Sequence, residues 1–398
     1  MKIAIFSDNF YPEISGISDS IISLAKELAG RGHQIRFYVP RYVRKNYAKT
    51  GLPPQEIDLG RDISIVRLFS VPYPTGTGQG RAIIPHPFVY SNAKKFNPDI
   101  IHTQLFFGAG LEALWCARVL KKPLIGTNHT AIKEFMKYSP LKGEWAENKI
   151  LRYVNWYYGK CDLITAPSRS VIDEMKFYGL EKESHVISNP LDIQTFSPLP
   201  NKNWLRKKFG FSGCTVVHAG RFSPERKIEV IIKAMPLVKK EFSKAELAVA
   251  GHGSAENDLK SLAAKLGISA SVKFMGFLGK PVLAEVYNAS EIFAITSTSD
   301  TQSMVMMQAM ASGLPVIGVK ARALPEYIRK NNGILVESDN PEALAQKIIF
   351  LFKNPEARKK LGAGARKFAL NFGSESIAKE WEKIYEKAIR EYNNHRRK

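Results

Sequence analysis

The sequence predicts an α/β protein with two doubly wound parallel sheets, each covered by helices on both faces. Two observations carry this prediction. Short apolar segments alternate with amphipathic helical patterns along the whole chain, as happens where helices connect the strands of a parallel sheet. The alternation also falls into two series. Between them, Pro190, Pro198 and Pro200 exclude a helix and indicate a linker.

The first series begins with a strand at 3–7. Apolar residues from Ile17 to Leu28 then recur every three or four positions, which predicts a helix with one buried face, ended by Gly30 and Gly32. Further strands of this series are expected at 35–39, 63–68, 99–103, 123–128, 162–166 and 185–188. The second series is expected at 215–218, 245–250, 272–275, 292–296, 315–319 and 333–336.

These series predict two Rossmann-like domains, over residues 1–195 and 196–372, followed by a terminal segment over 373–398. Ligands of such sheets bind beyond the carboxyl ends of the strands. With two domains, we expect the binding site in the cleft between them.

Composition limits the class of protein. The 398 residues are 44% hydrophobic and 24% charged, which is ordinary for a globular chain and excludes a disordered one. The 58 basic and 37 acidic residues give a net charge of +21, which favours a phosphate-bearing partner such as nucleic acid, a nucleotide or an anionic membrane.

The cysteines and the apolar segments indicate a location. Cys116, Cys161 and Cys214 form no C-x-x-C pair, and an odd number of separated cysteines fits a reducing cytosol. No apolar run approaches the roughly 18 residues that span a bilayer. We therefore expect a cytoplasmic protein that meets the inner face of the cell membrane only from its surface.

Two loops that follow predicted strands and precede helices suit a phosphate. The first ends at Gly16, where a missing side chain lets a ligand approach free backbone N–H groups, although a plain turn glycine is the better explanation of this residue taken alone. The second carries Arg221, Arg226 and Lys227 at the carboxyl end of the strand at 215–218. Arginine and lysine bind phosphate oxygens, and the alternative is a solvated basic loop.

A third loop, 297–303, precedes a helix expected to begin near Met304. Free N–H groups at Ser303, Met304 and Val305 suit a diphosphate, with Asp300 and Gln308 on either side. The other methionines of this helix are interpreted as core.

Three isolated residues are further candidates. Gly253 follows a strand and would lie under a nucleotide or form a simple turn. His129 ends a strand of the first domain and is expected to face the cleft, and His102 is a similar but weaker candidate. No D-x-D, H-E-x-x-H or P-loop pattern occurs, so we expect neither a bound metal nor a cofactor.

At these residues the chain resembles the family 4 glycosyltransferases, retaining enzymes of the GT-B fold. The resemblance covers essentially the whole chain. It rests on Tyr11-Pro12 with Gly16, Gly32-His33, Asn128-His129-Thr130, Asn189 with Asp192, Gly220-Arg221, and above all the segment from Ala309 to Val316. It implies a nucleotide-sugar donor in the C-terminal domain and an acceptor in the N-terminal domain. It also implies that the last helix, near Trp381 and Tyr385, crosses back to the N-terminal domain.

The resemblance also implies residue roles. His129 and Asp300 would be catalytic, and Asp300, Thr301, Gln302 and Ser303 would bind the donor sugar. The family has two glutamates with seven residues between them, and this chain has Asp300 and Gln308 at those positions. A neutral Gln308 accepts weaker hydrogen bonds from ribose hydroxyls, so we expect a loss of roughly 1 kcal/mol in nucleotide binding. Arg226 stands where the family has a phosphate-binding lysine, and Ser303 replaces a glycine.

The segment Ser299 to Gln302 is most similar to members that glycosylate diacylglycerol or related lipids, which implies a hexose transfer from a UDP-sugar to a membrane lipid. Two basic and aromatic stretches, 41–47 and 133–158, suit an anionic membrane surface, unless their aromatic side chains lie in the core. Three alternatives stay open: a GDP-mannose-dependent transfer to phosphatidylinositol or a polysaccharide, a non-catalytic nucleotide-sugar binder, and a nucleic-acid-binding protein. The last lacks a zinc-finger, RNA-recognition or helix-turn-helix motif, so we expect no nucleic-acid partner.

Overall fold

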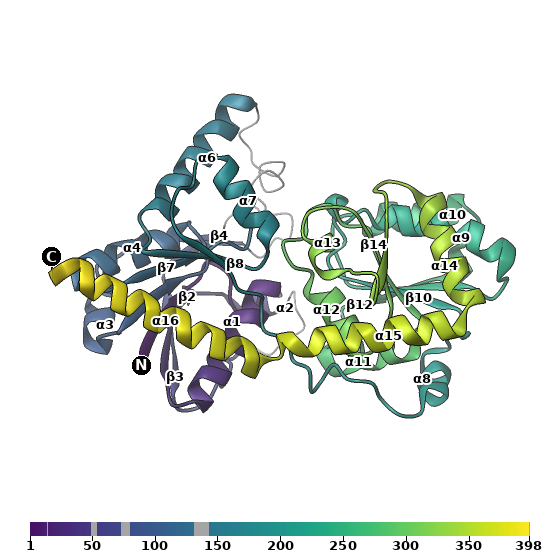
Figure 1. Cartoon of the computed structure of the whole chain (residues 1–398), viewed down its shortest axis with the longest axis horizontal. Helices are drawn as coiled ribbons and strands as arrows, with labels where there is room; N and C mark the ends of the chain where they lie inside the picture. Colours follow the sequence, from purple (N-terminus) through teal and green to yellow (C-terminus); the bar gives the residue numbers. More distant parts are fainter. Residues whose placement is uncertain (14, 49–53, 73–79, 131–142, 398) are drawn as a thin grey trace. The chain divides into compact units, whose positions relative to one another are not determined.

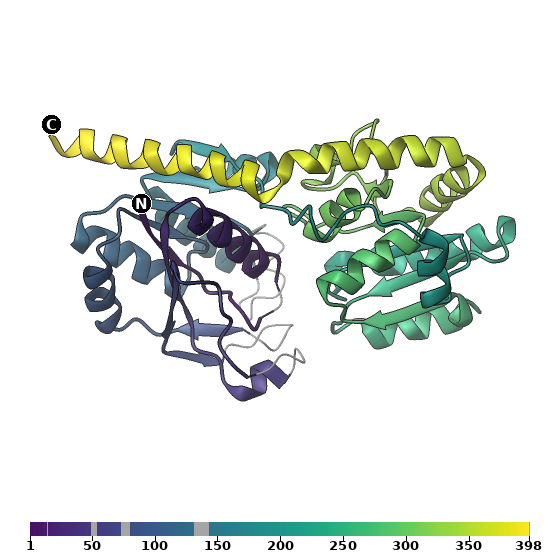
Figure 2. The same cartoon turned by 90° about the horizontal axis from the view of Figure 1, so that it is seen from below.

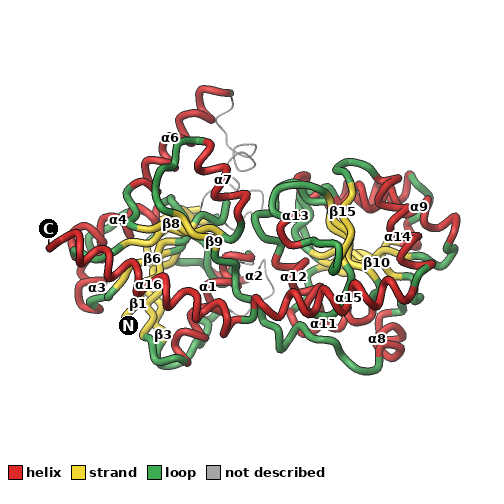
Figure 3. Tube along the Cα trace, in the orientation of Figure 1, coloured by secondary structure: helices red, strands yellow, loops and turns green. Residues whose placement is uncertain are grey.

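A computed structural model describes residues 1–13, 15–48, 54–72, 80–130 and 143–397 (Figure 1). The chain forms two compact units. The first comprises Met1–Pro190 and Ser374–Lys398, and the second comprises Leu191–Gly373. Each unit has a parallel sheet with helices around it, as Figure 3 shows, so the predicted fold class is confirmed.

The first unit has a seven-stranded parallel sheet in the order β3-β2-β1-β6-β7-β8-β9. Its strands are β1 Lys2–Phe6, β2 Gln34–Pro40, β3 Ile63–Leu68, β6 Ile100–Thr103, β7 Leu124–Thr127, β8 Leu163–Ala166 and β9 Ser184–Val186. Central strands are buried on both faces, as the fully buried run from Ile3 to Phe6 illustrates. Such strands are continuous apolar runs, which is why the sequence predicts them well.

A small antiparallel pair, β4 Ser70–Pro72 with β5 Arg81–Ile83, was not among the predicted strands. Both strands are short, and Pro72 cannot donate a ladder hydrogen bond. The sequence pattern therefore carries no strand signal at either segment.

The helices of the first unit are α1 Gly16–Gly30, α2 Arg44–Ala48, α3 Phe88–Phe96, α4 Gly108–Leu120, α6 Glu144–Gly159, α7 Arg169–Phe177 and α16 Ser374–Arg397. The Ser15 hydroxyl caps α1 by accepting a hydrogen bond from the Ser18 N–H at 3.1 Å. The long helix α16 belongs to this unit and lies beside α1 (Figure 2). Arg31 and His33 both contact Glu382 of α16, at 2.7 and 2.8 Å.

The second unit has a six-stranded parallel sheet in the order β12-β11-β10-β13-β14-β15. Its strands are β10 Thr215–Ala219, β11 Glu246–Ala250, β12 Val272–Gly276, β13 Ile292–Ile295, β14 Val316–Val319 and β15 Gly333–Val336. Its helices are α8 Lys202–Phe209, α9 Ile228–Glu241, α10 Glu256–Lys265, α11 Lys280–Ala289, α12 Met304–Ala311, α13 Leu324–Tyr327, α14 Pro341–Lys353 and α15 Pro355–Ala369. Three short 3₁₀ turns complete the unit, at Pro224–Arg226, Ser269–Ser271 and Leu370–Phe372. The helices α9 and α14 pack together, as do α12 and α15.

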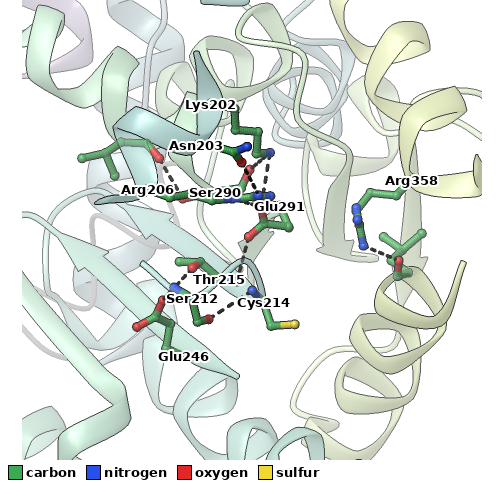
Figure 4. A network of polar contacts seen from close by, with 12 residues as sticks. Lys202, Asn203, Arg206, Ser212, Cys214, Thr215, Glu246, Ser290, Glu291 and Arg358 are labelled. Carbon is green, nitrogen blue, oxygen red and sulfur yellow. Dashed lines mark hydrogen bonds and ion pairs between the residues drawn. The ribbon is translucent and has the colours of Figure 1, made fainter. Parts of the chain in front are cut away.

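A polar network ties α8 to the amino edge of the second sheet (Figure 4). The Glu291 carboxylate is fully buried just before β13, yet its charge is matched. It accepts hydrogen bonds from the Arg206 guanidinium and, at 2.8 Å, from the Thr215 N–H, and Lys202 Nζ lies 3.3 Å away. Both carboxylate oxygens are therefore satisfied, and this edge of the sheet serves structure.

Candidate active site

At the opposite, carboxyl edge of the second sheet, two polar loops meet. One loop, residues 220–227, follows β10, and the other, residues 296–303, follows β13 and leads into α12. Because β10 and β13 are parallel neighbours, both loops lie at the same edge. The Thr296 hydroxyl donates to the Lys227 carbonyl at 2.8 Å, which fixes one loop against the other.

The Arg226 guanidinium forms an ion pair with the Asp300 carboxylate and thereby joins the two loops through their side chains. Asp300 is only 6% exposed, and the Arg226 side chain is 24% exposed. Burial alone would lower the pKa of Arg226, but the Asp300 carboxylate raises it above the ordinary value. The guanidinium is therefore a permanent cation held at this edge.

The other two predicted phosphate-binding cations are also paired with carboxylates. Arg221 lies 3.1 Å from Glu225, whose buried carboxylate also accepts from the Ser223 hydroxyl at 2.6 Å. Lys227 has a left-handed backbone, with φ of 53°, and its Nζ lies 3.2 Å from Asp339. Consecutive cations thus have different partners, because Arg226 contacts Asp300 and Lys227 contacts Asp339.

Five buried side-chain atoms around this edge have no hydrogen-bond partner among the residues that the structure describes. They are His218 Nε2, Arg226 Nε, Asp300 Oδ2, Ser303 Oγ and Gln308 Oε1. Buried polar atoms in folded proteins almost always have partners, and the network at the amino edge of the same sheet follows that rule. Such a concentration of unmatched donors and acceptors is what the polar lining of a ligand site provides.

The start of α12 faces the same region. Ser303 is the residue before the helix, and its side chain makes no cap hydrogen bond. The Met307 N–H donates to the Ser303 carbonyl at 3.0 Å, so the N–H groups before it, at Met304 and Val305 among others, have no acceptor within the helix. Helix N-termini of this kind bind anionic groups such as phosphates.

Gly220 leaves space beside this helix start. Its φ is 140°, and a Cβ atom built on it would lie 3.9 Å from His218 Nε2 and 4.0 Å from the Val305 side chain. His218 was not among the predicted site residues. Its ring is 1% exposed, and Nδ1 lies 2.9 Å from the Ala294 carbonyl. The sequence did contain a signal that could have identified His218, because it is a histidine at the end of an otherwise apolar strand.

The other predicted residues of the second unit lie in the same loops. Thr301 is half-buried and Gln302 buried, in the loop that holds Asp300. Gly253 has a packing reason for its identity, since a Cβ there would lie 2.0 Å from the Phe222 carbonyl. The absent side chain lets the loop after β11 approach the loop after β10 closely.

In the first unit, Gly16 is the first residue of α1 and His129 follows β7. His129 is held by a chain of hydrogen bonds. Its Nε2 lies 2.7 Å from Gln104 Oε1, and Gln104 Nε2 lies 3.0 Å from His102 Nε2. His102 Nδ1 in turn lies 2.9 Å from the hydroxyl of Tyr385 on α16.

Burial sets the charge of both histidines. It lowers the pKa of His129 to about 4, and it lowers that of His102 to about 3, with a smaller contribution from His129. Both rings are neutral near pH 7. His102 is fully buried, and its ring centroid lies 4.5 Å from that of Trp381. It therefore supports His129 through Gln104 and has no surface for a ligand.

Asp8 is a second unusual group of the first unit. Its carboxylate accepts from the Ala109 N–H at the start of α4, at 2.9 Å, and its Oδ2 is buried with no partner in the described part of the chain. Burial raises the pKa of Asp8 to about 7, against a lowering by the Ala109 hydrogen bond and with a further increase from Glu13.

Neither a metal cluster nor a membrane span is found in the described ranges. No group of three or more histidine, cysteine, aspartate or glutamate side chains there could hold a metal ion. No described helix combines the length and the apolar character needed to cross a bilayer.

Comparisons with known proteins identify the family. Residues 14–195 match the model described as Glycosyltransferase Family 4, and residues 206–368 match Glycosyl transferases group 1. The chain is 32% identical to an alpha-monoglucosyldiacylglycerol synthase of Streptococcus pneumoniae over 324 residues, which are 80% of this chain and 70% of that protein. The chain belongs to glycosyltransferase family 4.

Another relative of this family 4 glycosyltransferase is named for its donor. A GDP-mannose-dependent alpha-mannosyltransferase of Corynebacterium glutamicum is 26% identical, over 85% of this chain and 77% of that protein. Among solved structures, Anabaena HepE in complex with UDP has a TM-score of 0.76 at 20% identity, covering 97% of this chain and all of that one. The likeness to HepE supports the GT-B fold, and the family establishes a glycosyltransferase that uses a nucleotide sugar.

Proposed function

We propose that the protein transfers a hexose from a UDP-sugar to a hydroxyl of a membrane lipid such as diacylglycerol, with retained anomeric configuration and without a metal ion. The observation that carries this proposal is the set of buried, unmatched polar atoms around the start of α12 and the Arg226–Asp300 pair. The lipid acceptor is supported by the relatives named alpha-monoglucosyldiacylglycerol synthase, from Streptococcus pneumoniae and Acholeplasma laidlawii.

Each group has a role in this proposal. Arg221, Arg226, Lys227 and the first N–H groups of α12 neutralise the diphosphate, because cations and helix N-termini stabilise phosphate charge. Asp300, Thr301, Gln302 and Ser303 orient the sugar hydroxyls. Gln308 accepts from the ribose, and Gly16 leaves room for the nucleotide sugar. Gly253 contributes through the close approach of the loops after β10 and β11.

The chemical step follows from this placement of charge. The bond between the sugar C1 and the diphosphate oxygen breaks, and the acceptor oxygen bonds to C1 on the same face. The proton of the acceptor hydroxyl passes to the departing diphosphate. The cations and helix N-terminus stabilise the developing negative charge, and neutral His129 contacts the sugar as it becomes positive.

Helix α6 supports the membrane part of the proposal. Trp145 and Trp156 are 67% and 47% exposed, and Lys149 Nζ lies 3.9 Å from the centre of the Trp145 ring. Tyr157 and Tyr158 face the core instead. Exposed tryptophans beside cations are typical of surfaces that lie on anionic membranes.

The two predicted basic and aromatic stretches differ in how they fit this role. Part of the stretch 133–158, residues 133–142, lies outside the described residues. In the stretch 41–47, Tyr42 and Tyr47 are buried, and the exposed side chains there are mainly the cations. The membrane-facing aromatic groups of the proposal are therefore those of α6.

The experiment that tests the function offers UDP-glucose or GDP-mannose with vesicles of diacylglycerol and anionic phospholipid, and follows sugar incorporated into lipid. We expect incorporation from UDP-glucose, reduced by salt because exposed charges are screened beyond about 8 Å at physiological ionic strength. Incorporation from GDP-mannose alone would favour the mannosyltransferase alternative, which the Corynebacterium relative supports. Binding of a donor with no incorporation into any acceptor would favour a non-catalytic binder.

Vesicle co-sedimentation tests the membrane surface separately. We expect Trp145→Ala with Trp156→Ala to weaken binding to anionic vesicles several-fold, since each exposed aromatic side chain contributes apolar contact area. Trp204→Ala, in the second unit and 59% exposed, is the matched control. Equal binding to neutral and anionic vesicles would contradict this surface.

A further inference from the structure

His218 lies among the residues of the candidate site but has no role in the proposed chemistry. Its ring lies at the end of β10, behind Gly220 and beside the start of α12. One nitrogen, Nε2, is buried and without a partner among the described residues. A polar atom in that condition needs either a water molecule or a ligand group.

The other nitrogen fixes the protonation state of the ring. Nδ1 lies 2.9 Å from the Ala294 carbonyl, and a carbonyl oxygen only accepts, so Nδ1 carries the hydrogen. In a neutral ring Nε2 is then a bare acceptor. A bare acceptor and a phosphate oxygen repel one another, whereas a protonated Nε2 donates to that oxygen.

The charges around His218 balance in the structure. Burial is the largest cause that lowers the pKa of His218, to about 4, and the hydrogen bond to the Ala294 carbonyl raises it. Arg226 lowers this pKa and Asp300 raises it, each by less. These two groups are each other's partners in the ion pair. A diphosphate bound at the start of α12 adds negative charge close to the ring, and that change favours the imidazolium.

We propose that His218 is a further donor-binding residue, which takes up a proton when a nucleoside diphosphate sugar binds and donates from Nε2 to the diphosphate. The proposal rests on the proposed function and adds to it a proton-linked step. Both phosphates of a nucleotide sugar are esterified, so the donor itself takes up no proton near neutral pH. The linkage therefore belongs to the protein, and the same uptake is expected with UDP-glucose and GDP-mannose if both bind.

Proton uptake by His218 determines how donor affinity changes with pH. The complex holds one proton more than the free protein, so affinity rises as pH falls between the pKa of the bound and the free state. In that interval, we expect the dissociation constant of UDP-glucose to fall by up to about tenfold for each unit by which the pH is lowered. Titration calorimetry in buffers of different ionisation enthalpy measures the protons taken up per donor bound.

Two variants of His218 test the contribution of its ring to donor binding apart from that of the rest of the site. His218→Gln supplies an N–H donor that does not titrate, so we expect binding within about threefold of wild type at neutral pH and no proton uptake. His218→Phe removes the donor, and we expect about tenfold weaker binding, the loss of one charge-assisted hydrogen bond. His185→Gln, in β9 of the first unit, is the control and should keep the uptake.

The outcomes distinguish this inference from the proposed function. Donor binding by the wild type without proton uptake, or uptake that persists in His218→Gln, would overturn the inference and leave the function intact. No binding of either donor would overturn both. If His218→Gln fails to fold, the ¹⁵N spectrum of wild-type histidines decides, since protonation of His218 on addition of UDP-glucose supports the proposal and an unchanged ring contradicts it.

Discussion

Arg226 and Asp300 form an ion pair although they are 74 residues apart in the sequence, and this contact joins the loops after two neighbouring strands. One loop supplies cations to the proposed diphosphate site and the other supplies the groups for the sugar. Under the proposed function, the pair holds a phosphate-binding group and a sugar-orienting group in fixed positions relative to each other. Preorganised charge of this kind is the main means by which a protein stabilises a departing diphosphate.

Replacing Arg221 tests the diphosphate site without breaking this pair. We expect Arg221→Ala to raise the dissociation constant of UDP-glucose at least about tenfold, because one charge-assisted hydrogen bond to a phosphate is lost. Titration calorimetry measures the change. Arg61→Ala is the matched control, because Arg61 is 94% exposed and belongs to the first unit. An unchanged dissociation constant of UDP-glucose in Arg221→Ala would show that Arg221 does not bind the diphosphate.

Gln308 tests the contact with the ribose. Its Oε1 is buried and without a described partner, and a carboxylate in that place would accept stronger hydrogen bonds from ribose hydroxyls. We expect Gln308→Glu to tighten donor binding by about fivefold, equivalent to roughly 1 kcal/mol, and to leave kcat largely unchanged. Steady-state kinetics with varied UDP-glucose separates the two parameters. A large change in kcat at constant donor affinity would place Gln308 near the reacting carbon instead.

Substitutions of His129 and Gln104 test the contribution of the first unit to catalysis. We expect His129→Ala to lower kcat at least about tenfold while donor binding to the second unit is preserved. Gln104→Glu places a carboxylate where Oε1 now contacts His129 Nε2, which raises the pKa of His129 from about 4. The acidic limb of the pH profile of kcat should therefore move to higher pH, because a cationic His129 repels the positive sugar.

Gln104→Asn keeps the amide and serves as the control for Gln104→Glu, since it shortens the side chain without adding charge. Any loss of activity in Gln104→Asn should leave the acidic limb where it is. Full activity of His129→Ala, or an unmoved limb in Gln104→Glu, would contradict the role of His129.

Asp8 links stability to pH. Its pKa is about 7 in the folded protein against 3.8 as its ordinary value, so the folded state holds the extra proton between those values. The contribution of Asp8 to stability is therefore present at low pH and is lost as pH rises toward 7. We expect Asp8→Asn to be more stable than wild type by at least about 1 kcal/mol near pH 8, and equal to it near pH 4.

Urea unfolding at both pH values measures this difference. Asp99→Asn is the control, because the exposed Asp99 carboxylate also accepts a backbone hydrogen bond, from the Lys2 N–H at 2.7 Å. A stability difference for Asp8→Asn that does not vary with pH would show that Asp8 is ionised throughout this range.

The strands could be predicted because buried parallel strands are continuous apolar runs bounded by polar loops. The segment 292–296, for example, contains the strand β13 Ile292–Ile295, which is apolar and buried throughout. The pair β4–β5 could not be predicted, since three-residue strands are too short to show a periodic pattern. The composition of the loops also indicated where cations and carboxylates gather, since the carboxyl ends of parallel strands meet at one edge.

The sequence alone could not predict which side chains contact one another. That Arg226 contacts Asp300 while the adjacent Lys227 contacts Asp339 depends on the left-handed turn at Lys227. Gln104 contacts His129 because β6 and β7 are neighbours in the sheet, and spacing alone does not give strand order. The unmatched Nε2 of His218 required the position of the Ala294 carbonyl.

The anomeric configuration of the product tests the central claim most directly, that the second unit presents a nucleotide sugar for transfer on the face from which the diphosphate leaves. UDP-glucose carries an α-linked glucose, and NMR of the glycolipid formed from it and diacylglycerol reads the configuration of the new bond. An α-linked product is predicted, because attack and departure share one face. A β-linked product would contradict the mechanism, since it requires attack from the opposite face.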